Sequence, residues 1–157
     1  MTELLTLWGS FYANHATIRS LIAFFHVGAL ITGGGVAVAA DRSLLMGRLH
    51  HGGSRKTLLE GLASTHRFVI ISLMVIGVSG ALLFAADYDT LVYSRIFWIK
   101  MGLVAALAVN GGLLWRAERR AMTGDDSAWR TLRTTSIASI TLWMLTTLGG
   151  VVLPNIG

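Results

Sequence analysis

Two basic side chains stand inside long apolar stretches of this sequence. His26 lies in FFHVGALITGGG and Lys100 lies in FWIKMGLVAA. An ionisable group inside a membrane segment is costly and marks a functional site by default. A neutral imidazole can ligate haem iron, and an ammonium group can pair with a carboxylate. The sequence therefore predicts a buried polar site that contains these two residues.

Small residues follow His26 on one face of its segment. Positions 26, 29, 30, 33 and 37 share a helical face and read His, Ala, Leu, Gly and Ala. This face leaves room for a flat porphyrin, so we expect His26 to ligate haem b, with Gly33 and Gly34 against the ring. The glycine run is equally compatible with close helix contact. A hydrogen bond to a neighbouring helix is likewise the alternative for His26.

Besides His26 and Lys100, two further polar residues, His66 and Asn110, are candidates for the same or a second site. Lys100 and His26 both lie about 6–9 Å below the same membrane boundary, at 1.5 Å per residue. Lys100 either pairs with a haem propionate or a substrate carboxylate, or extends to the interface beside Trp98. His66 is a second metal-ligand candidate, but its depth differs from that of His26 by about 18–20 Å. Its alternatives are a phospholipid headgroup contact and a helix-start role. Asn110 is expected to face the bundle, bond a neighbouring helix and contribute to cofactor binding.

The elements that position these residues are four apolar segments, 20–40, 68–86, 96–115 and 134–154. Each approaches the roughly 20 residues that cross a bilayer, and backbone groups in lipid must pair within helices. Hydrophobic residues make up 54% of the chain and charged residues 13%. We predict an all-α integral membrane four-helix bundle, formed by residues 1–157 as one domain. We expect the last helix to stop at Pro154. These segments contain no Asp or Glu, which argues against a proton relay.

The basic residues predict the orientation. Ten of the 13 Lys and Arg residues flank the two connections on one side: Arg42, Arg48, Arg55, Lys56, Arg67, Arg116, Arg119, Arg120, Arg130 and Arg133. The positive-inside rule places these connections in the cytoplasm and both termini outside. The net charge of +5 is thereby explained without a nucleic-acid partner. Residues 1–19 are expected to form an interfacial helix, in a bacterial-type inner membrane.

The chain resembles the HemJ-type protoporphyrinogen oxidases and the CopD-like membrane families. The resemblance rests on the stretch FFHVGALITGGG with His26, the stretch FWIKMGLVAALAVNGG with Lys100, and VVLP at the end of the fourth segment. It implies that His26 is a haem b ligand and that Lys100 is a catalytic residue. The leading prediction is a haem-dependent membrane protein that acts in electron transfer or as an oxidoreductase.

Two other functions remain open at this point. The first is a non-enzymatic structural or assembly subunit, or a homodimer, formed through glycine-rich helix faces. The second is a CopD-like transporter of copper or a small solute, although the six Met residues form no M-x-x-M motif. A coloured protein would favour haem, and a colourless one the alternatives.

Overall fold

The part of the chain that the structure describes forms four long helices and two short ones. The computed structural model describes residues 2–47 and 55–156. The long helices are α2 (Ala16–Gly47), α3 (Arg55–Ala86), α5 (Arg95–Met122) and α6 (Ala128–Ile156). The short ones are α1 (Thr2–Asn14) and α4 (Tyr88–Leu91), and the described residues include no strand. All four long helices are long and apolar enough to cross a membrane. The predicted all-α four-helix membrane bundle is confirmed.

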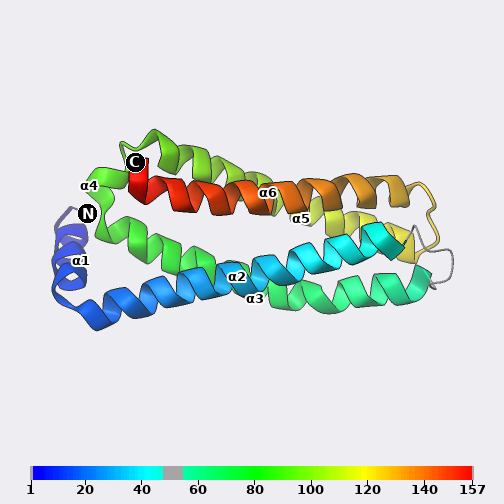
Figure 1. Ribbon diagram of the computed structural model, residues 1–157, viewed down its shortest axis with the longest axis horizontal. Helices are drawn as coiled ribbons and strands as arrows, with labels where there is room; N and C mark the ends of the chain where they lie inside the picture. Colours follow the sequence, from blue (N-terminus) through cyan, green and yellow to red (C-terminus); the bar gives the residue numbers. More distant parts are fainter. Residues whose placement is uncertain (1, 48–54, 157) are drawn as a thin grey trace.

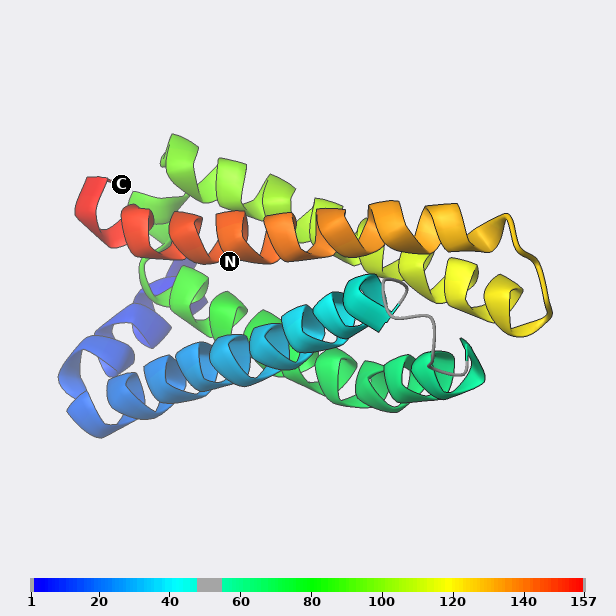
Figure 2. The ribbon, with the colours of Figure 1, turned by 45° about the vertical axis from the view of Figure 1, so that its right-hand side comes forward.

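The long helices are arranged as two pairs (Figure 1). α2 packs along α3, and α5 packs along α6; α2 and α6 join the two pairs, whereas α3 and α5 touch only briefly. Both chain termini, α1 and α4 lie at one end, which we call the terminal end. At the opposite end, the loop end, α2 and α5 finish and α3 and α6 begin (Figure 2).

Helix α1 lies across the terminal end of the bundle (Figure 1). The Trp8 indole donates a hydrogen bond to the carbonyl of Leu82 in α3, at 2.9 Å. Gly9 brings the two backbones together, because a Cβ atom there would lie 3.2 Å from the Ala86 carbonyl oxygen. Leu4 and Leu7 are exposed on the other face of α1. This arrangement is the one expected of a helix that lies along a membrane surface.

The helices extend beyond the predicted spans at the loop end. The first predicted segment ends at Ala40, but α2 continues to Gly47, and α5 continues past Trp115 to Met122. Charged side chains are compatible with a helix wherever neighbouring helices cover them, so hydropathy marks the lipid-facing part and not the whole helix. α6 also runs two residues past Pro154, to Ile156, so the prediction that it stops at this proline was wrong.

Protein atoms occupy the space beside the two glycines that were predicted to face a porphyrin. A Cβ atom on Gly33 would overlap the side chain of Ser72 in α3, and one on Gly34 would lie 3.0 Å from the Trp143 ring in α6. Gly35 has open space around it. Gly33 and Gly34 therefore serve close helix contact, which is the way membrane helices associate without a hydrophobic driving force.

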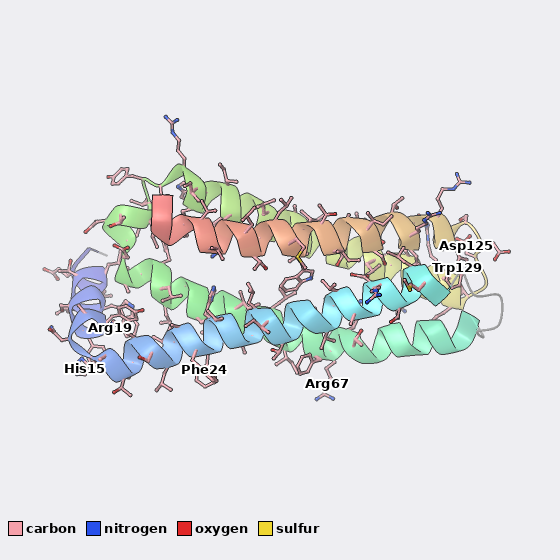
Figure 3. The ribbon with its side chains drawn as sticks, viewed as in Figure 1. His15, Arg19, Phe24, Arg67, Asp125 and Trp129 are labelled. Carbon is pink, nitrogen blue, oxygen red and sulfur yellow. The ribbon has the colours of Figure 1, made fainter. Side chains whose placement is uncertain are left out.

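The connection between α5 and α6 is a tight turn. Gly124 has a φ of 90°, a conformation that residues with a Cβ atom rarely adopt. Asp125 Oδ1 then accepts hydrogen bonds from the backbone N–H and the hydroxyl of Ser127. Asp125 and Trp129 lie together at the loop end (Figure 3). The turn fixes the start of α6, and with it the register of the α5–α6 pair.

Candidate functional site

Two carboxylates are buried between the helices near the loop end. Asp41 in α2 and Glu118 in α5 are each only 2% exposed. Both lie within the long apolar helices, Ala16–Met46 and Arg95–Met122. Asp41 lies one residue beyond the first predicted span and Glu118 three residues beyond the third. Hydropathy falls at both positions and therefore gave no sign that neighbouring helices bury them.

These carboxylates form a polar group with side chains from the other two helices. We call Asp41, His66, Glu118, Ser136 and Ser139 the loop-end cluster. Nδ1 of His66 in α3 lies 3.2 Å from Oε2 of Glu118, and His66 is also within electrostatic range of Asp41. From α6, the hydroxyls of Ser136 and Ser139 face Asp41. Each of the four long helices thus contributes at least one member.

The loop-end cluster is not fully paired. Oδ1 of Asp41, Oε2 of Glu118 and the Ser136 hydroxyl are buried without a hydrogen-bond partner. The His66–Glu118 contact is close enough for an ion pair, but its geometry is not that of a hydrogen bond. Buried polar atoms are paired in the great majority of cases, so unpaired carboxylate oxygens call for an explanation. A proton or a ligand group would satisfy them.

A pocket of about 480 Å³ adjoins the cluster. Asp41, His66 and Ser139 lie in its wall, and the rest of the wall is largely apolar, with Leu73, Leu107 and Trp143 among its members. The residues on its α3 and α5 rims are exposed, namely Ile70, Ala108, Gly111, Gly112 and Trp115. It therefore opens sideways between α3 and α5, which touch only briefly, and we call it the lateral pocket.

His26 occupies a different position, nearer the terminal end. Its Nδ1 lies 2.9 Å from the hydroxyl oxygen of Ser79 in α3, and that hydroxyl donates to the carbonyl of Val75 at 2.6 Å. Since the hydroxyl proton is engaged there, the imidazole must be the donor, with its proton on Nδ1. The ring also packs on Gly80, where a Cβ atom would lie 3.3 Å from Cε1. His26 thus connects α2 to α3.

Lys100 is half-buried and packs against two glycines of α6. A Cβ atom on Gly150 would lie 3.6 Å from its Nζ, and one on Gly149 would lie 3.7 Å from its Cβ. Its charge is within range of His26. The structure thus places the two residues predicted to share a depth near one another. Asn110 donates to the backbone carbonyl of Thr135 in α6, at 2.9 Å, so it faces the bundle and bonds a neighbouring helix as expected.

The residues around His26 do not fit a haem on the predicted face. The Nδ1–H tautomer leaves the Nε2 lone pair for a metal, as does the hydrogen bond that a metal-bound histidine donates from its other ring nitrogen. However, Ser72 and Trp143 fill the space at Gly33 and Gly34 that a porphyrin would need. His26 and His66 do not meet, because the His26 partner Ser79 lies about 20 Å along α3 from His66, at 1.5 Å per residue. No group of three metal-ligating side chains occurs among the described residues.

Comparisons with protein-family models, with curated proteins and with solved structures find no match to this chain. Its function must therefore be argued from its own geometry. The loop-end cluster and the lateral pocket are the features to interpret, because they combine unpaired buried charge with space for a ligand. Of the predicted site residues only His66 belongs to them. Asp41 and Glu118 could have been found from sequence by extending the helical pattern into the connections, where each falls on the buried face.

Proposed function

We propose that the protein binds a small membrane-soluble molecule in the lateral pocket and couples this binding to proton exchange at the loop-end cluster. This is the behaviour of a proton-coupled membrane carrier, and it develops the small-solute alternative left open by the sequence. The observation that carries the proposal is the unpaired Oδ1 of Asp41, in the wall of a pocket that opens toward lipid.

The pocket has the dimensions and composition of a ligand site. Its volume of about 480 Å³ falls within the roughly 300–1,000 Å³ of small-molecule sites, which are mostly apolar with a few placed polar groups. A molecule entering between α3 and α5 would come from the bilayer, so it needs an apolar body. Its polar group would then meet Asp41 and Ser139.

The loop-end cluster supplies groups for proton exchange. A buried carboxyl without a counter-ion is normally neutral, because burial of an isolated charge is very unfavourable. Ionisable side chains inside membrane helices are typical of ion pathways and proton relays. Asp41 would exchange its proton by way of His66 with Glu118, which lies four residues from the end of α5 at the loop end.

Calorimetry on the protein in lipid nanodiscs tests this proposal. Three phenyl-bearing probes would be titrated: tetraphenylphosphonium, tetraphenylborate and the neutral triphenylphosphine oxide. At least one should bind, and its heat should differ between buffers of unlike ionisation enthalpy, which shows proton exchange. Gly112→Leu should abolish binding, because Gly112 is in the pocket wall. Gly102→Leu is the matched control, since Gly102 is equally open but lies outside the wall. Absence of Gly112-dependent binding for all three probes would reject the proposal.

Haem-dependent electron transfer is the second candidate. It is favoured by the Nδ1–H tautomer of His26, which presents Nε2 as an acceptor. It would need α2 to separate from α3 and α6 around Gly33 and Gly34. An absorption spectrum of protein produced with adequate haem tests it: a Soret band that His26→Ala removes would favour this candidate over the carrier.

A further inference from the structure

The described wall of the lateral pocket carries one carboxyl group and no Lys or Arg, in a chain that is basic overall. Asp41 and His66 are its ionisable members, and it contains no Lys or Arg among the described residues. The whole chain carries a net charge of +5. Arg67, which follows His66 in the sequence, points outward from the bundle (Figure 3). The described wall of the pocket thus contains no cationic Lys or Arg side chain, in contrast with the chain as a whole.

The surroundings of Asp41 leave it available to a positive ligand. α3 brings His66 and α5 brings Glu118, and α6 brings only the hydroxyls of Ser136 and Ser139. None of these is a fixed cation, and His66 already has Glu118 at 3.2 Å. Among the described residues, Oδ1 of Asp41 therefore has no hydrogen-bond donor, and no Lys or Arg lines the pocket beside it. An anionic ligand would meet the carboxyl of Asp41 and no Lys or Arg among the described wall residues.

An aromatic wall favours the same ligand class. Trp143 is buried and lines the pocket, and indole rings attract cations to their faces. Trp115 at the rim shows this attraction already, because the Arg119 guanidinium lies 5.0 Å from its ring centroid. Because the Arg119 guanidinium already covers one face of Trp115, we expect a ligand cation to bind mainly against the ring of Trp143.

We propose that the lateral pocket takes up lipophilic organic cations in exchange for the proton of Asp41. This inference rests on the proposed function and names its substrate class. As the cation enters, the O–H bond of the Asp41 carboxyl breaks, and the carboxylate pairs with the cation. The proton passes by way of His66 and Glu118 to water at the loop end. One positive charge enters the site and one leaves it, so the buried charge does not change.

The three probes test charge selectivity directly, because tetraphenylphosphonium and tetraphenylborate have the same shape and opposite charges. The cation should bind at least about tenfold more tightly than the anion, since like charges in a buried site repel strongly. Its binding should release close to one proton, whereas the neutral probe should release none.

Asp41→Asn separates the failure of this inference from the failure of the proposed function. The variant should lose at least about tenfold in affinity for the cation, together with the proton release, and should keep its affinity for the neutral probe. That retained affinity also shows that the variant is folded. Gly112-dependent binding of the borate or the neutral probe at an affinity equal to that of the cation would overturn the cation inference. It would leave a ligand pocket in place.

Discussion

At the terminal end, His26 donates to Ser79 and Ser79 donates to Val75, so each polar group in the series has a partner. At the loop end, Asp41 and Glu118 retain buried oxygens that have no hydrogen-bond partner. The first arrangement stabilises the α2–α3 pair. The second lies beside a pocket and keeps carboxylates ready for a proton or a ligand. Membrane depth alone therefore does not identify a functional residue in this bundle. A buried polar group without a hydrogen-bond partner beside a pocket is the more selective criterion.

The largest effect should come from the tight packing that holds α2 on α3. Gly33→Leu would place a side chain where Ser72 lies, and we expect it to lower the free energy of unfolding by about 3 kcal/mol or to prevent folding. Gly35→Leu, which meets open space, should have little effect. Unfolding in mixed micelles by a denaturing detergent measures both. Equal stability of the two variants would contradict the packing of α2 on α3.

Removal of the terminal-end partner should have a clear effect on stability. Ser79→Ala removes the hydroxyl that accepts from the His26 Nδ1–H, and loss of one hydrogen bond costs about 0.5–1.5 kcal/mol. The same unfolding experiment measures the loss, with Ser43→Ala as control, because Ser43 is exposed and bonds only within its own helix. If Ser79→Ala were as stable as the control, the His26–Ser79 bond would not stabilise the α2–α3 pair.

The loop-end cluster should respond in the opposite direction. Asp41→Asn replaces a buried acid with a neutral amide whose N–H groups can donate to the Ser136 and Ser139 hydroxyls that face this position. We expect the free energy of unfolding to rise by about 1 kcal/mol, the net contribution of one added hydrogen bond. Functional sites often gain stability when their unpaired groups are removed. A large destabilisation by Asp41→Asn would show that this carboxylate is structural, and the contrast between the two ends would disappear.

The smallest effect is expected at the α5–α6 turn. The hydrogen bonds from the Ser127 side chain and backbone hold the pKa of Asp125 below its usual value. A carboxyl with a lowered pKa in the folded state stabilises it above its unfolded pKa, near about 4, and this contribution is lost as the pH falls through the folded pKa. Asp125→Ala should therefore be slightly less stable than wild type at neutral pH. The difference in the free energy of unfolding between the two should become smaller in acid. A difference that grows in acid would contradict this.

The four-helix membrane bundle could be predicted from the sequence alone, because runs of about 20 apolar residues cross a bilayer only as helices. The same reasoning gave the bundle-facing side of Asn110, since an amide is unfavourable in lipid. The burial of charged residues near the connections could not be predicted in this way. Hydropathy falls at Asp41 and Glu118, and a sequence shows only that a charged residue has been reached, not whether another helix covers it.

The pairing of helices was decided by the tertiary structure. From the sequence, Gly33 and Gly34 could serve either close helix contact or a porphyrin. The positions of Ser72 and Trp143 show that they serve close helix contact. Likewise, Asp41, His66 and Glu118 lie far apart in the chain and come together because α2, α3 and α5 run side by side in one bundle. The sequence by itself determined that helices span the membrane, because that follows from the transfer energy of local segments. Which polar groups meet, and which stay unpaired, depends on helix register and rotation, and these are fixed only by packing between the segments.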